Sequence, residues 1–163
     1  MQRTSLVGQN WRQQHTRPDL RRAALAGTTA IAAWIVAQWL DITLTSNNYD
    51  DVQLLGTAFG RVTAWKSVGF VIHTLNGVLF GITYATVAEP RLSGPGWRRG
   101  LIAAEIECLA LSTLTPLVDR WHPAVRDGRM APMATPLALL QAIWRHAVFG
   151  VVLGTVYRPK PKA

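Results

Sequence analysis

Cysteine and catalytic signatures are almost absent from this chain of 163 residues. The one cysteine, Cys108, excludes a disulfide within the chain and a thiolate metal cluster without a second chain. The G-x-S-x-G, H-E-x-x-H, P-loop and dinucleotide-binding motifs do not occur. We therefore expect a protein that is not an enzyme and that carries no cofactor.

Charged residues are scarce over four long stretches of the sequence, which are residues 23–40, 67–88, 100–118 and 136–157. The first two stretches contain no Asp, Glu, Lys or Arg, the third contains two Glu, and the fourth contains one Arg. A helix needs roughly 20 mostly apolar residues to cross about 30 Å of hydrocarbon. The sequence therefore predicts an all-α protein with four transmembrane helices. A soluble bundle with unusually buried helices is the alternative, but such helices normally keep a polar face.

The N-terminal region has no apolar core of the length that a cleavable signal peptide needs. Its first 22 residues are polar and rich in arginine. We expect the first transmembrane helix to act as an uncleaved signal-anchor. An arginine-rich, acid-poor leader is also typical of a mitochondrial transit peptide, and that alternative stays open.

Positive charge is abundant, with a formal net charge of +8. Eleven Lys and Arg residues lie in the N-terminal region, in the connection after the second span and in the C-terminal tail; five lie in the other two connections. The positive-inside rule then predicts a multi-pass protein of the bacterial inner membrane with both termini in the cytoplasm. Because the basic residues flank apolar spans, we expect them to meet the lipid bilayer and not a nucleic acid.

The spacing His-x3-Gly-x3-Gly-x2-Tyr occurs at residues 73–84 and again at 146–157. This repetition predicts a four-transmembrane-helix bundle built from two parallel helix-pair repeats, at about 21–88 and 98–158. A basic cytoplasmic tail (1–20) and a short C-terminal tail (159–163) flank this single membrane domain. The first helices of the two repeats match more weakly, with Arg21-Arg22 aligned to Arg98-Arg99.

The motif residues of each helix share one narrow stripe. Glycines four residues apart let two helix backbones approach closely in a membrane. We therefore expect helix packing at four glycines, namely Gly77, Gly81, Gly150 and Gly154. Gly27 lies outside the motif, and we expect its replacement by leucine to cost less stability.

The two motif histidines allow two interpretations. In the first, each histidine is a packing residue with one interhelical hydrogen bond. In the second, His73 and His146 form an intramembrane polar site together with Glu105. Glu105 shares the most polar stripe of its helix, which we expect to face the bundle interior. Haem or a transition metal bound by these side chains is an alternative. For Glu107, on the other side of the helix, we expect a structural ion pair with Arg145, whose long side chain can bridge a difference in depth.

Short motifs outside the repeat are Pro90-Arg91 after the second span and Asp119-Arg120-Trp121-His122-Pro123 after the third. With the repeated motif, they make residues 65–158 resemble uncharacterised small four-helix bacterial inner-membrane proteins of the YagU-like kind. The resemblance implies four helices and an inner-membrane location, and it carries over no catalytic residue.

Taken together, these patterns predict a non-enzymatic structural or accessory membrane component, packed in a homodimer or a larger membrane complex. A small transporter or channel subunit that uses the polar cluster near the bilayer midplane is one alternative. A haem- or metal-binding membrane protein is another.

Overall fold

The computed structural model describes residues 18–58 and 63–159, and helices joined by turns account for its regular structure. Among these described residues there is no β-strand, so the all-α prediction is confirmed. Most of the predicted N-terminal tail (1–17), residues 59–62 of the first connection and the last residues of the C-terminal tail (160–163) lie outside the described residues.

Three helices are individually long and apolar enough to cross a membrane, and a bent helix pair passes the same test when taken together. The three are α1 (Leu20–Thr45), α3 (Trp65–Thr83) with its continuation η1 (Tyr84–Ala88), and α7 (Pro136–Val156). The bent pair is α4 (Gly96–Ser112) and α5 (Thr115–Trp121). Two short helices, α2 (Asp51–Gly56) and α6 (Pro123–Arg126), lie in the connections. Three to four apolar helices fit a membrane location.

Side-chain caps fix where several helices begin. Asp19 accepts a hydrogen bond from the Arg22 amide at the start of α1, and Thr135 does the same for α7, which continues with Pro136. Asp50 caps the short helix α2 by accepting from the Gln53 amide at 3.0 Å. A carboxylate or hydroxyl at this position satisfies an amide that the helix itself leaves unpaired.

The third apolar stretch is not one straight helix, as the sequence predicted, but two helices at 50° to each other. The break falls at Thr113 and Leu114, just before Pro116 in the first turn of α5. Proline has no amide hydrogen, and its ring clashes with the carbonyl four residues earlier, so a straight helix cannot continue through it.

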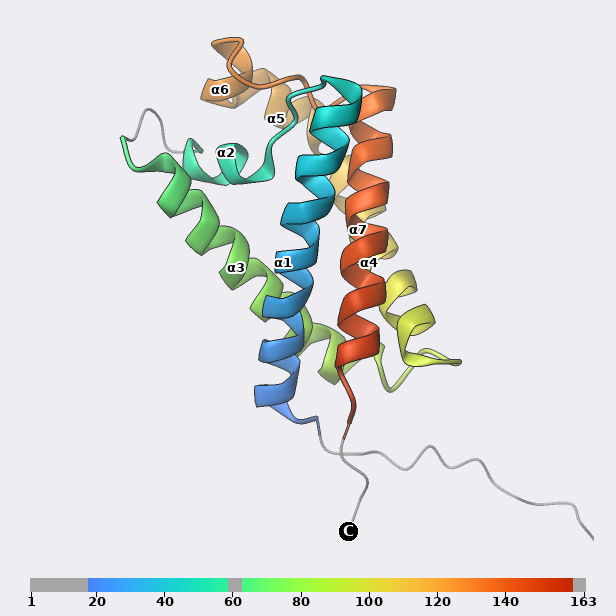
Figure 1. Ribbon diagram of the computed structural model, residues 1–163. Coiled ribbons are helices and arrows are strands. Elements are labelled where there is room, and N and C mark those ends of the chain that lie inside the picture. The colour runs from blue at the N-terminus through green and yellow to red at the C-terminus, as the bar shows by residue number, and fades with distance from the viewer. Residues whose placement is uncertain (1–17, 59–62, 160–163) are drawn as a thin grey trace, which may run out of the picture.

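The long helices form a row in the order α3, α1, α7, α4, because the main contacts join α1 with α3, α1 with α7 and α4 with α7 (Figure 1). Helices α3 and α4 therefore stand at opposite ends of the row. The row closes near the chain ends, where α4 contacts η1 and the rings of Tyr84 and Tyr157 meet at 5.9 Å.

Glycines make the crossing of α1 and α3. A Cβ atom added to Gly81 would collide with the carbonyl of Ala23, and one added to Gly77 would collide with the side chain of Ile31. Gly27 is equally tight, since its Cβ would meet the Gly77 carbonyl. The expectation that leucine costs less stability at Gly27 than at the motif glycines is therefore wrong, because small residues are needed on both helices of a close crossing.

The crossing of α4 and α7 uses the same device. A Cβ added to Gly154 would collide with the carbonyl of Gly96, and one added to Gly150 would approach Gly100 and Ala104. Gly81 and Ala23 thus contact each other as Gly154 and Gly96 do, with both partners shifted by 73 positions. This register differs from the predicted alignment of Arg21-Arg22 with Arg98-Arg99, which requires a shift of 77.

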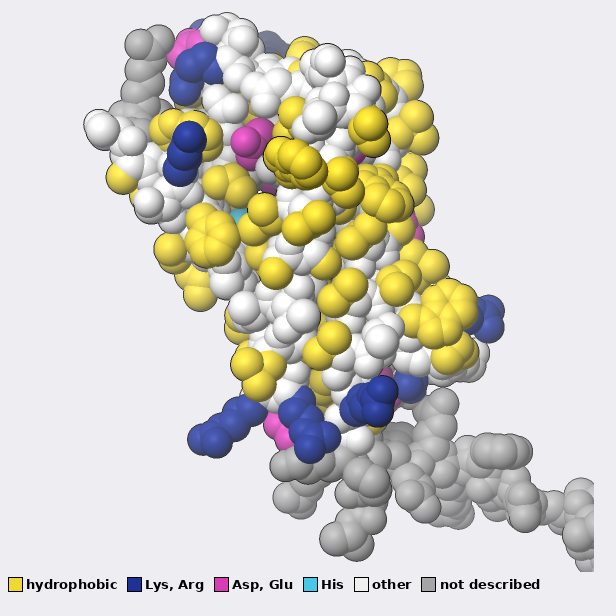
Figure 2. Space-filling view, viewed as in Figure 1, with side chains coloured by type: hydrophobic (Ala, Val, Ile, Leu, Met, Phe, Trp, Pro, Cys, Tyr) yellow, Lys and Arg dark blue, Asp and Glu magenta, His cyan; other side chains and the backbone are white. Residues whose placement is uncertain are grey.

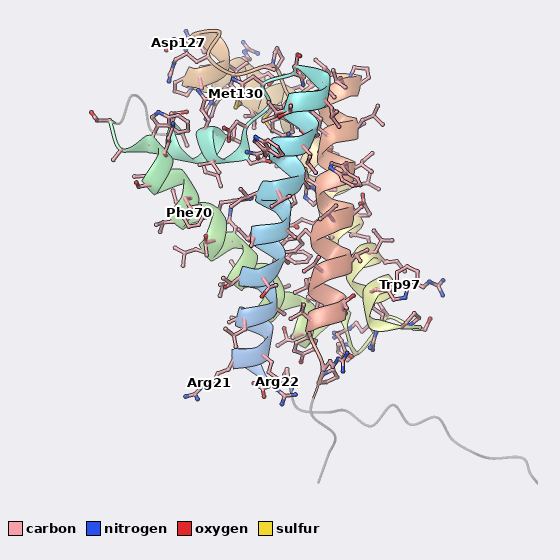
Figure 3. All side chains as sticks on the ribbon, viewed as in Figure 1. Arg21, Arg22, Phe70, Trp97, Asp127 and Met130 are labelled. Atoms are coloured by element: carbon pink, nitrogen blue, oxygen red, sulfur yellow. The ribbon has the colours of Figure 1, made fainter. Side chains whose placement is uncertain are left out.

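Both ends of the described chain emerge from one end of the bundle, where the Arg22 guanidinium donates to the Arg158 carbonyl at 3.2 Å (Figure 1). Figure 2 shows Lys and Arg side chains at this end and an apolar band above it. Arg21 and Arg22 extend downward there, whereas Asp127 and Met130 lie at the opposite end with α5 and α6 (Figure 3).

Candidate functional site

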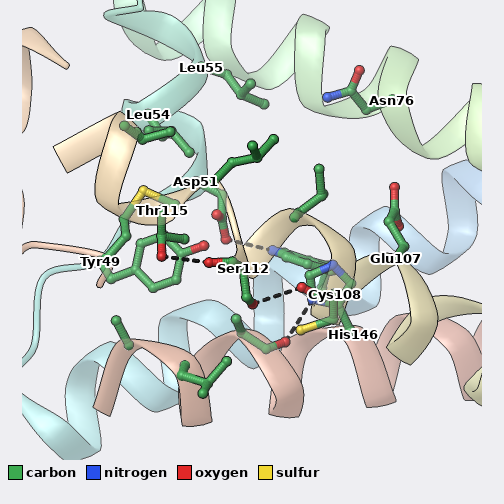
Figure 4. A pocket seen from close by; sticks show the side chains of 18 of the residues that line it. Tyr49, Asp51, Leu54, Leu55, Asn76, Glu107, Cys108, Ser112, Thr115 and His146 are labelled. Atoms are coloured by element: carbon green, nitrogen blue, oxygen red, sulfur yellow. Dashed lines mark hydrogen bonds between the residues drawn. The ribbon is translucent and has the colours of Figure 1, made fainter. Parts of the chain in front are cut away.

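A cavity of about 580 Å³ lies between α3 and α4, the helices at the two ends of the row. Helix α1 contributes Trp34 to its wall, and α7 contributes Phe149. His146 of α7 and Asp51 of α2 also line it (Figure 4). The other lining side chains are mainly apolar. Sites for small molecules typically have volumes of about 300–1,000 Å³ and an apolar lining with a few polar groups.

Close glycine contacts at both ends of α3 hold this space open. Near the chain ends α3 crosses α1 at glycines, and from there it diverges from α1 (Figure 1). At its other end α3 packs on α2, where Gly69 meets the carbonyl of Val52 and Gly56 meets the carbonyl of Trp65. The short helix α2 therefore lies between α1 and α3 as a wedge, and the cavity forms beside it.

Arg145 of α7 is fully buried, and five hydrogen bonds hold its guanidinium. It forms a bidentate ion pair with Asp41 of α1, and both N···O distances are 2.6 Å. It also pairs with Asp51 of α2 at 2.8 Å. One cation thus joins α1, α2 and α7. The predicted ion pair between Arg145 and Glu107 is wrong, because two carboxylates on other elements already occupy the guanidinium.

Neutral polar groups complete this network. Gln141 donates to Asp41 at 2.7 Å, and the Trp34 indole donates to Asp51 at 3.0 Å. The ring of Tyr49 lies 4.6 Å from the guanidinium carbon of Arg145. Burial raises the pKa of the Tyr49 phenol well above its usual value, and the nearby Asp51 carboxylate raises it further. Buried charges held by this many hydrogen bonds fix the relative positions of their helices.

Both motif histidines lie against the same residue, Trp34, as edge-to-face partners. The ring centroids are 5.4 Å apart for His73 and 4.5 Å apart for His146. His146 Nδ1 donates to the Ala142 carbonyl at 2.8 Å, within its own helix. His73 Nε2 is buried without a hydrogen-bond partner. The interhelical hydrogen bond expected of a purely packing histidine is thus replaced by ring contacts.

The two glutamates of α4 lie opposite to their predicted positions, in which Glu105 faced the interior of the bundle and Glu107 lay on the other side of the helix. Glu107 lines the cavity with His73 and His146, and Glu105 does not. In Figure 4 the Glu107 side chain stands apart from Asp51 and extends into the cavity. The predicted polar site of His73, Glu105 and His146 is therefore wrong in one residue. Glu107, and not Glu105, lies in the cavity with the two histidines. The small residues of α4 that pack on α7 fix this rotation.

Three participants escaped the sequence interpretation, namely Trp34, Asp41 and Asp51. Asp51 is the first residue of α2, and Asp41 lies in the last two turns of α1. The sequence contained one indication of the two aspartates, because a guanidinium inside an apolar stretch, such as that of Arg145, needs carboxylate partners. Among the described residues, no group of three or more His, Cys, Asp or Glu side chains has the arrangement of a metal site.

Comparisons with protein-family models, curated proteins and solved structures found no match to the chain. The resemblance to YagU-like proteins accordingly stays a prediction.

Proposed function

We propose that this protein is a non-enzymatic component of the bacterial inner membrane that binds a small, mainly apolar molecule in the cavity between α3 and α4. One observation carries the proposal: a cavity of about 580 Å³, lined by aromatic and aliphatic side chains and a few polar groups, lies within a bundle of apolar helices. Such a lining suits a ligand that reaches the protein from the membrane.

Four spans with both termini in the cytoplasm are part of the proposal. In support, both described chain ends lie at one end of the bundle, which requires an even number of crossings. The bent pair of α4 and α5 then counts as one span. The two glycine crossings, displaced by 73 residues from each other, support an origin of the helix pairs by duplication.

Binding of N-phenyl-1-naphthylamine, a neutral apolar dye whose fluorescence rises in apolar surroundings, tests the cavity. The purified full-length protein in detergent is titrated with the dye and compared with Leu111→Trp, which places a large ring in the cavity lining. Leu109→Trp is the matched control, because Leu109 lies on the same helix, is similarly exposed (59% against 51%) and does not line the cavity.

We expect saturable dye binding by the unsubstituted protein and by Leu109→Trp, with affinity lost by about tenfold or more in Leu111→Trp. Equal binding by all three proteins would mean that the dye enters the detergent or another surface, and the proposed cavity function would be rejected.

A transport role is the second candidate, favoured by the presence of Glu107 and two histidines inside the cavity. Polar and ionisable groups within a membrane commonly mark the path of a substrate or proton. Reconstituted vesicles distinguish the two roles: a transporter moves the bound molecule across the bilayer, whereas a binding protein only retains it.

A further inference from the structure

Among the described residues that line the cavity, Glu107 is the acidic group that lacks a counter-charge. The other carboxylate in the lining, Asp51, is paired with Arg145 at 2.8 Å. No described residue forms an ion pair or hydrogen bond with the Glu107 side chain. None of the Lys and Arg residues that the structure describes lines the cavity either. An acidic group in this position attracts a cationic ligand and repels an anionic one.

Aromatic rings supply the second half of the recognition chemistry. Trp34, Phe80 and Phe149 line the cavity, and Phe149 contacts both of the others, with ring centroids 6.0 Å apart for Trp34 and Phe149 and 5.5 Å apart for Phe80 and Phe149. The faces of aromatic rings attract organic cations, and the attraction increases when water is excluded. An unpaired buried ring nitrogen, Nε2 of His73, also lies in this wall and can accept a hydrogen bond from an ammonium ligand.

The remaining ligand classes fit less well. A fatty acid or phospholipid phosphate needs a free cation, but the guanidinium of Arg145 is already saturated by Asp41, Asp51 and backbone and amide oxygens. A neutral lipid would cover the Glu107 carboxylate without replacing the water that it loses, which is costly. A ligand with an apolar body and one positive charge satisfies both the carboxylate and the rings.

We propose that the cavity binds lipophilic organic cations, with Glu107 as the residue that recognises the positive charge. This inference rests on the proposed function and narrows it to one class of ligand. The carboxylate makes the electrostatic contact, and the rings of Trp34, Phe80 and Phe149 enclose the apolar body of the ligand.

Tetraphenylphosphonium, a lipophilic cation, is the probe. Its binding to the purified full-length protein in detergent is measured by equilibrium dialysis, together with Glu107→Gln and Glu105→Gln. The second variant is the matched control, because it removes the same charge from the same helix outside the cavity lining. We expect Glu107→Gln to weaken binding by about tenfold or more and Glu105→Gln to change it by less than about twofold.

Binding of the neutral dye N-phenyl-1-naphthylamine distinguishes a failure of this inference from a failure of the proposed cavity function. We expect Glu107→Gln to bind the dye at least as tightly as the unsubstituted protein does, because a neutral ligand then covers no carboxylate, and this binding also shows that the variant is folded. If Glu107→Gln binds tetraphenylphosphonium as tightly as the unsubstituted protein while the dye still binds, the cationic ligand class is refuted and the cavity function stands. If Glu105→Gln weakens cation binding as much as Glu107→Gln, general surface charge explains the effect, and the role of Glu107 is refuted. If neither probe binds, both proposals fail.

Discussion

Replacement of Arg145 by glutamine tests how the bundle is held together. The guanidinium makes all of its contacts with groups from α1, α2 and the turn between them. Glutamine keeps part of the length and polarity of the side chain but removes the charge. Asp41 and Asp51 then lose their shared cation inside the bundle.

The magnitude follows from the burial of this group. Arg145 is 0% exposed, and its ion pairs with Asp41 and Asp51 are 2.6 and 2.8 Å long. Removal of one partner of a buried ion pair costs about 3–5 kcal/mol, because the remaining charge stays buried without compensation. Whole domains are typically stable by only about 5–15 kcal/mol. We therefore expect Arg145→Gln to lower the free energy of unfolding by about 3–5 kcal/mol.

A double-mutant cycle identifies the partner. Unfolding in mixed detergent micelles, followed by circular dichroism, is measured for Arg145→Gln, Asp41→Asn and the double variant. We expect a coupling energy of about 1–3 kcal/mol, since residues that share a hydrogen-bond network are not additive. The same cycle with Glu107→Gln is the control, and there we expect additivity within about 0.5 kcal/mol.

The opposite result is easily recognised. A coupled pair of Glu107 and Arg145, with additive effects of Asp41 and Arg145, would restore the ion pair predicted from the sequence. It would also remove the unpaired carboxylate on which the recognition of cations depends.

Three further predictions concern packing, topology and pH. Gly81→Leu should lower the free energy of unfolding by about 2 kcal/mol or more, because it forces α1 and α3 apart, whereas the exposed Ala110→Leu should change it little; equal losses would remove the special role of the crossing. In a chain with its native cysteine replaced by alanine, Asn48→Cys should react with an impermeant thiol reagent in intact cells and Ser93→Cys should not, and the reverse pattern would invert the proposed orientation. The raised pKa of Tyr49 means that the folded protein keeps the phenol proton at a pH where the unfolded chain has lost it, so stability should fall as the pH rises above about 10. Tyr49→Phe should reduce this fall between pH 8 and pH 11, as measured by detergent unfolding, and an unchanged fall would show that other groups cause it.

The sequence was sufficient to locate the long apolar helices, because apolar length is a local property. The stripe of Gly77 and Gly81 also indicated where α3 touches a neighbour. It did not indicate Gly27, because the partner surface of a close crossing carries no fixed spacing of its own.

The orientation of α4 was missed for a different reason. Polarity was used to decide which face points inward, and this favoured Glu105. The packing of Gly96, Gly100 and Ala104 on α7 decides it instead. At 100° per residue, Glu107 lies about 20° from Gly96 around the helix, whereas Glu105 lies about 180° away. In lipid, close backbone contact determines helix rotation more strongly than polarity does, so the small residues were the better guide.

The order of the helices in the row has a consequence for biogenesis. Each glycine crossing joins helices that are neighbours among the long helices of the chain, so α1 can dock on α3 while the second half is still being synthesised. The cation that neutralises Asp41 and Asp51 lies on α7, which follows the other described helices in the chain and is therefore synthesised after them. A nascent chain must therefore hold two uncompensated acids, on α1 and α2, until α7 has been synthesised. Docking of α7 supplies Arg145, so the charge of the two acids is neutralised only when the second half of the bundle packs on the first.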